Sequence, residues 1–238
     1  MTYPEMKVIY EDNALVKIDV PYCPGFLAFK EVPHFVDLYD KMKKERPDIK
    51  IGVVLVDGNG ILHCNQCGCA SHLGVLLDLP TIGCSKNIFA VDGINQSMIE
   101  GIKQDFWESS RKKGYYVPLV GRSGKVWGAA LKSGPDSNDP LIVSVGHRLS
   151  ISSAVEIVNT CCRTRIAEPI RYADKKSRHL ISGYNLGSGC RGKERTKAMH
   201  KIEEKKSLAK TNTPLEQIQG VDDRDEQSEG SEESYDEG

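Results

Sequence analysis

The chain has 238 residues, of which 39% are hydrophobic, enough for one domain of moderate size with a proper core and a tail. Its formal net charge of -1 hides a division: residues 222–238 hold nine acidic residues and one arginine, which leaves 31 basic against 24 acidic residues in 1–221. A basic body with an acidic tail is compatible with nucleic-acid binding, although composition alone favours an ordinary solvated surface. No stretch approaches the roughly 20 apolar residues of a membrane helix, and Met1 to Val20 lacks the apolar centre of a secretory signal.

The first third of the chain predicts strands, a rigid loop and a helix. Residues 6–20 look like two short strands around the turn Glu11-Asp12-Asn13. The segment PYCPGF at 21–26 must form a stiff loop. Apolar residues then recur at helical spacing to Arg46, with Pro33 in the first turn or at a kink.

The rest of the body alternates strands with helices, which favours an α/β sheet. Residues 51–56 are typical of a fully buried parallel strand that ends at DGNG. The next elements expected are a helix at 73–79, a strand at 80–83, a hairpin at 116–131 with its turn at 121–124, a buried strand at 141–145 broken by Gly146-His147, and a helix capped by Ser152 or Ser153. From about Gly187 the apolar periodicity stops, so we expect a disordered tail that is first basic and then acidic.

Four side chains are placed where elements end, and together they suggest chemistry on a phosphodiester. Asp57 follows an apolar strand, Glu31 starts a helix, Lys86 follows a strand and His147 follows the second buried strand. Each has an ordinary structural explanation, such as a turn aspartate or a carboxylate in the first turn of a helix. As a set, they suit a hard divalent cation and a phosphate.

The cysteines offer a competing interpretation. His63, Cys64, Cys67, Cys69 and His72 have part of the spacing of a zinc site, although free thiols explain them better. Cys161 and Cys162 are adjacent on a predicted helix, so one should face the core and the other solvent. All eight cysteines should be mostly free thiols of a reducing, intracellular compartment.

Five segments in order resemble the endonuclease V family over about residues 2–180. They are PYCPGFLAFKE at 21–31, VDGNGILH at 56–63, ASHLGVLLDLPTIGCSK at 70–86, SVGHRLS at 144–150 and EPIRYADKKSR at 168–178. The resemblance implies an RNase H-like, three-layer α/β domain at 1–185 with a mixed sheet, followed by the tail at 186–238. It also implies hydrolysis on the 3′ side of inosine with Mg²⁺ or Mn²⁺.

The resemblance assigns roles to individual residues. Glu31 and Asp57 would bind the metal, His147 would be a further catalytic residue, and Lys86 would contact phosphate. Asp174 and Arg178 match late family positions without an assigned role. The remaining positions form a strand-separating wedge and a hypoxanthine pocket built from backbone groups and a histidine: Pro21, Tyr22, Pro24, Gly25, Leu27, Gly58, His63 and Gly68.

The chain departs from the family pattern at its start. The family's opening strand, with the first metal-binding aspartate, is expected to be missing, and Asp12 and Asp19 are the nearest carboxylates. The alternative function is therefore an inosine-binding protein that does not cleave. We expect a monomer in the cytoplasm, nucleus or nucleolus, with no membrane partner. Its expected substrate is inosine-containing single-stranded RNA, or deaminated DNA.

Overall fold

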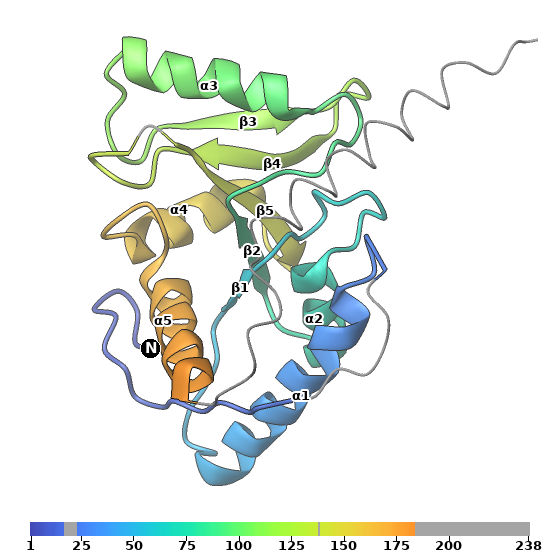
Figure 1. The fold of residues 1–238 in the computed structure, drawn as a ribbon, viewed down its shortest axis with the longest axis vertical. Coiled ribbons are helices and arrows are strands. Elements are labelled where there is room, and N and C mark those ends of the chain that lie inside the picture. The colour runs from blue at the N-terminus through green and yellow to red at the C-terminus, as the bar shows by residue number, and fades with distance from the viewer. Residues whose placement is uncertain (17–22, 138, 184–238) are drawn as a thin grey trace, which may run out of the picture. The chain divides into compact units, whose positions relative to one another are not determined.

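The computed structural model describes residues 1–16, 23–137 and 139–183, and these residues form helices around one mixed sheet (Figure 1). No described helix is long and apolar enough to cross a membrane. In chain order the elements are α1 (Ala28–Glu45), β1 (Val54–Asp57), α2 (Cys69–Leu77), β2 (Thr81–Ser85), α3 (Gln96–Glu108), β3 (Tyr116–Val120), β4 (Val126–Leu131), β5 (Leu141–His147), α4 (Ile151–Cys161) and α5 (Glu168–Gly183).

The sheet has the order β1-β2-β5-β4-β3, in which β1 and β2 are parallel and the other three neighbouring pairs are antiparallel. β1 and β2 run parallel, with Asp57 opposite Cys84. β5 runs antiparallel to β2, with His147 opposite Thr81. The end of β1 therefore lies beside the end of β2, whereas the end of β5 lies beside the start of β2.

The two faces of the sheet carry different helices because neighbouring strand residues point to opposite sides. On β5, Leu141 and Val143 pack with α4 and the start of α5, and Ile142 between them packs with α3. α3 was not predicted, although its signals are in the sequence. Asn95 caps it by accepting a hydrogen bond from the Met98 amide at 3.0 Å, and Ile99, Ile102 and Phe106 form its buried stripe.

A third apolar cluster joins α1 and α2 to β1, through Val32 of α1, Leu73 of α2 and Val56 of β1. β1 lies at the edge of the described sheet, and Val56 is its one buried residue. The prediction of a parallel strand is confirmed, but the prediction of a fully buried one is wrong. A strand with a paired neighbour on one side only is covered less completely than a central strand.

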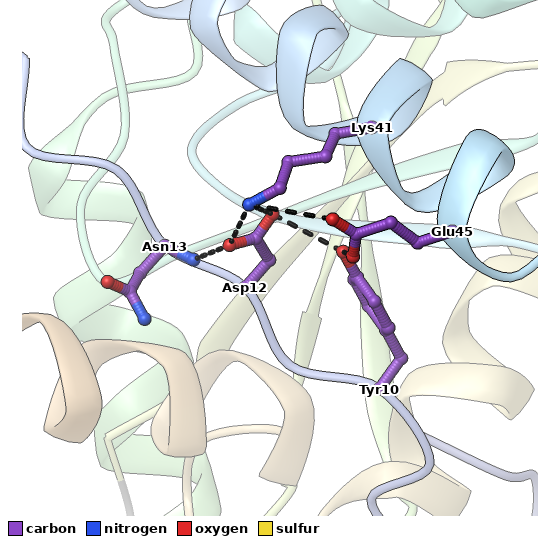
Figure 2. A network of polar contacts seen from close by, with 5 residues as sticks. All are labelled: Tyr10, Asp12, Asn13, Lys41 and Glu45. Carbon is purple, nitrogen blue, oxygen red and sulfur yellow. Dashed lines mark hydrogen bonds and ion pairs between the residues drawn. The ribbon is translucent and has the colours of Figure 1, made fainter.

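Residues 6–16 form no strand, so the predicted pair of strands is wrong in its described part. This segment is attached to two helices by side chains instead. Tyr10 donates to Glu45 at 2.9 Å and Lys41 lies 3.0 Å from Asp12, both on the α1 side (Figure 2). On the α5 side, Tyr172 donates to Glu11 at 2.6 Å. Apolar alternation becomes a strand only where a neighbouring backbone pairs with it; residues 17–20 lie outside the described residues.

The other predicted elements are confirmed with shifted bounds. The strand at 80–83, the helix at 73–79 and the hairpin at 116–131 correspond to β2, α2 and β3–β4. The predicted break at Gly146-His147 is wrong, because β5 continues to His147, which still pairs with Thr81. The prediction that Ser152 or Ser153 caps the next helix is wrong: Ser150 caps α4, and its hydroxyl accepts from the Ser153 amide at 3.1 Å. The expected tail at 186–238 lies outside the described residues.

Candidate active site

Glu31 and Asp57 are two carboxylates from α1 and β1, and the charge of Asp57 acts on Glu31. Asp57 is the last residue of β1, and Glu31 lies in the first turn of α1. Partial burial raises the pKa of Glu31, and the negative charge of Asp57 raises it further. Asp57 is more exposed, yet desolvation by the surrounding protein is also the main cause that raises its pKa. The surroundings therefore disfavour the ionised form of each carboxylate on balance, and a bound cation would stabilise it.

Lys86 joins this pair because β2 runs parallel to β1 and ends beside it. Its ammonium group favours the charged form of Asp57, which partly lowers the pKa of that carboxyl. Lys86 and Asp57 also line a small cavity of about 40 Å³. The sequence-based expectation that Glu31, Asp57 and Lys86 lie together is consistent with this arrangement.

The structure adds Asp174 and Arg178, which come from α5. Asp174 lines the same cavity, and its charge raises the pKa of Asp57. Arg178 donates to Asp174 at 2.9 Å and lowers the pKa of Asp57. The sequence carried a signal for them, since they stand at i and i+4 in a matched segment. Their role depends on α5 packing near β1, which no local pattern reveals.

His147 does not join these residues, so its expected place among them is wrong. It lies opposite Thr81 at the start of β2, whereas Asp57 lies opposite Cys84. The difference is three strand residues, roughly 10 Å along the sheet. His147 instead lies with its Nε2 3.5 Å from Asp78, which also pairs with Arg148 at 2.8 Å. The antiparallel direction of β5 explains the separation.

The loop at 58–68 folds back from Asp57 across the sheet. The Gly58 amide donates to the Cys84 carbonyl at 3.1 Å, and the Ile61 amide donates to the Val145 carbonyl at 2.8 Å. A side chain at Gly68 would place its Cβ 2.3 Å from the Asn59 carbonyl oxygen. Since the Gly68 amide also donates to Gly60 at 2.9 Å, the amides of Gly58 and Gly68 hold this loop in place and are not free to read a base.

His63 and Gly25 meet through Asn65. The Asn65 side-chain amide donates to the Gly25 carbonyl at 3.2 Å, and its backbone amide donates to His63 Nδ1 at 3.3 Å. His63 is buried, lies edge-to-face against Phe89 at 4.7 Å, and has its pKa lowered by that burial. Pro24 and Leu27 are exposed beside Gly25. The wedge residues Pro21 and Tyr22 lie outside the described residues, so their role stays a prediction.

The cysteines do not assemble a metal site in the described part of the chain. No three His, Cys, Asp or Glu side chains there come close enough together to hold an ion. His72 contacts the ring of Phe29 at 4.8 Å. Cys161 and Cys162 are both buried, so the expectation of one surface thiol is wrong. α4 ends at Cys161, and the backbone of Cys162 then pairs with that of Ala167 in an isolated antiparallel β-bridge.

Comparison with known proteins identifies the relatives of this chain. Residues 1–175 match the family model described as Endonuclease V. Mouse Endonuclease V is 48% identical over 181 residues, which cover 76% of this chain and 53% of the mouse protein. Human Endonuclease V is 43% identical over 181 residues, which cover 76% of this chain and 63% of the human protein. The chain thus spans less than two thirds of either relative.

Solved structures agree with the sequence matches. The crystal structure of human ENDOV has a TM-score of 0.71 at 44% identity, and covers 76% of this chain and 75% of its own. Endonuclease V of Ciona intestinalis, in complex with a 24mer DNA containing an inosine followed by a ribo-adenosine, has a TM-score of 0.71 at 34% identity and covers 76% of each chain. These likenesses confirm the RNase H-like α/β fold expected from the sequence.

Proposed function

The chain belongs to the endonuclease V family, and we propose that it is an endonuclease that hydrolyses a phosphodiester bond on the 3′ side of inosine. The observation that carries the proposal is the set of Asp57 at the end of β1, Glu31 within reach of its charge, and Lys86 after the parallel strand β2. Two carboxylates with raised pKa values and one lysine are the groups that hold a cation and a phosphate.

We propose Mg²⁺ as the cofactor, with Mn²⁺ as the alternative. Glu31 and Asp57 would hold it, and Asp174 from α5 is a further carboxylate whose charge acts on Asp57. When bound, the cation supplies positive charge that offsets the negative charge developing on the phosphate. Lys86 would hold a phosphate oxygen through its ammonium group, which already acts on the Asp57 carboxylate.

We propose that the extruded base binds between the turn at 25–27 and His63. The hydrogen bonds of Asn65 fix these two segments relative to each other. The φ of Gly25 is 80°, a left-handed conformation that glycine adopts without strain. A base that leaves its stack loses about a few kcal/mol of stacking energy, and contacts in a pocket must offset that loss.

RNA is the substrate that we propose first, with deaminated single-stranded DNA second. The related Ciona protein was crystallised on DNA in which a ribo-adenosine follows the inosine. The basic surplus of residues 1–221 suits either nucleic acid, because both carry a phosphate backbone. We propose that the chain acts as a monomer.

The test is cleavage of a short single-stranded RNA with one inosine, by the full chain in Mg²⁺, beside the same RNA with guanosine. We expect one product, cut on the 3′ side of the inosine, that disappears when EDTA is added. A matched DNA with one deoxyinosine ranks the two substrates. Equal cleavage of the inosine and guanosine RNAs, or no metal-dependent product, would contradict the proposal.

One observation favours the second candidate, an inosine-binding protein that does not cleave. In the described residues no third ligand side chain comes close enough to Glu31 and Asp57 to complete a site, and Asp174 is paired with Arg178. In the same assay, tight and inosine-dependent binding without any product would establish this alternative.

A further inference from the structure

The turn between β3 and β4 is clamped to Asp92. The Asp92 carboxylate accepts hydrogen bonds from the amide and the hydroxyl of Ser123, and from the Trp127 indole at 2.8 Å. The Arg122 amide donates to the Asp92 carbonyl at 2.8 Å. A side chain at Gly121 would place its Cβ 1.9 Å from the same carboxylate. The turn is therefore held in one conformation, and it presents the next residue, Lys125, at a fixed place.

Lys125 is exposed, and its ammonium group has neutral neighbours. Its Nζ lies 3.2 Å from the Gln66 side-chain oxygen and 4.1 Å from the centre of the buried Trp127 ring. Within the described ranges, no carboxylate lies within ion-pair distance of it. Arg122 in the same turn differs, because its positive charge acts on Asp92. Lys125 thus keeps its positive charge available to an anion.

Gln66 connects Lys125 to the candidate base pocket. The Gln66 amide donates to the His63 carbonyl at 2.8 Å, and the adjacent Asn65 donates to Gly25. The loop itself contains no lysine or arginine between Asp57 and Cys69. Lys125, directly before β4, is therefore a cation that contacts this loop through Gln66.

We propose that Lys125 binds a backbone phosphate of the substrate strand next to the extruded base, while Gln66 and Trp127 hold its ammonium group in place. This inference rests on the proposed function and adds a second phosphate contact to that of Lys86. A phosphate contact positions the strand and reads no sequence. Lys125 is thus a binding and positioning residue, and the identity of the base should not change its contribution.

The experiment measures how the affinity of the full chain for a fluorescent single-stranded RNA depends on salt, in EDTA so that no strand is cut. A protein loses about 0.7 of slope, in log affinity against log salt, for each lost phosphate contact on a single strand. We expect Lys125→Gln to reduce the slope by about that amount for inosine and guanosine RNAs alike. Lys43→Gln, an exposed lysine in the last turn of α1, is the matched control and should leave the slope unchanged.

A charge exchange sharpens the test. The double variant Lys125→Gln with Gln66→Lys moves the positive charge across the 3.2 Å contact and should restore the slope. An unchanged slope in Lys125→Gln, or an equal loss in Lys43→Gln, would overturn the inference. A different result would contradict the proposed function alone. That result is equal affinity for the inosine and guanosine RNAs, and it leaves the salt slopes of Lys125→Gln and the unaltered chain open to comparison. A chain that binds neither RNA at low salt contradicts both.

Discussion

Two aspartates of this protein lie in opposite electrostatic surroundings. Asp57, at the end of β1, has its pKa raised, chiefly by partial burial. Asp92, at the turn between β3 and β4, has its pKa lowered, first by the hydroxyl of Ser123 and then by the indole of Trp127. The charge of Asp92 is satisfied within the fold, whereas that of Asp57 is only partly offset, by Lys86 and Arg178. Carboxylates left in that condition are typical of functional sites, and satisfied ones of structural sites.

The largest effect that tests this difference between Asp57 and Asp92 is expected when the Asp57 carboxylate is removed. Asp57→Ala should lower inosine-dependent cleavage by at least about a hundredfold, the lower end of what a lost electrostatic group costs at a reaction centre. Because the raised pKa means that the fold disfavours the ionised carboxylate, thermal stability should stay equal or rise. Cleavage rates and thermal melts at pH 7 give both quantities. Retained cleavage would remove Asp57 from the reaction.

The second prediction compares Asp174 with His147, which lie at different ends of the strands. Asp174→Asn should lower the cleavage rate by about tenfold or more, the range seen when a group beside a metal site is lost. His147→Asn should leave the rate unchanged, because His147 lies at the start of β2 beside Asp78. Single-turnover rates measured with excess enzyme separate the two. The reverse order would restore the role that the sequence suggested for His147.

The third prediction concerns the loop that joins the two regions. Gly60→Ala places a Cβ 2.0 Å from the Val145 carbonyl oxygen, so the loop must move off the sheet. We expect the free energy of unfolding to fall by about 1–3 kcal/mol or more, as for other overpacked sites. Gly101→Ala in α3 meets nothing within 4 Å and serves as the control, with equal or higher stability. Urea denaturation of the two variants measures the difference.

The smallest effect is expected at Asp92 and depends on pH. Because the pKa of Asp92 is lowered, its ionised form stabilises the fold at pH values above about 4, and this contribution is lost as pH falls through the lowered pKa. Asp92→Asn should therefore be less stable than the unaltered chain at pH 7, and the difference should shrink at pH about 3. Denaturant melts at both pH values test this. A difference that does not change with pH would mean that the charge of Asp92 contributes nothing.

The sequence revealed the strands that form the site, and the direction of β1, but not the direction of β5. The apolar run before DGNG, the strand before Lys86 and the hairpin at 116–131 could all be recognised locally. The parallel direction of β1 could also be predicted, but the antiparallel direction of β5 could not, and that direction separates His147 from Asp57.

The prediction of strands at residues 6–16 was wrong for a related reason. Their apolar alternation is typical of a strand, yet a strand forms only through pairing, and here the segment contacts α1 and α5 through side chains. Asp174 illustrates the opposite case. Its charge and position were visible, but its effect on Asp57 depends on a contact between segments more than a hundred residues apart. Patterns along the chain predict elements, and only their packing produces the site.

The central claim is that Glu31 and Asp57 form the cation site of this protein. Titration of the full chain with Mn²⁺, followed by electron paramagnetic resonance of the free ion, tests it without requiring cleavage. The account predicts that the unaltered chain and His147→Asn bind Mn²⁺ alike, whereas Asp57→Asn and Glu31→Gln lose binding. Equal Mn²⁺ binding by Asp57→Asn and the unaltered chain would contradict the account.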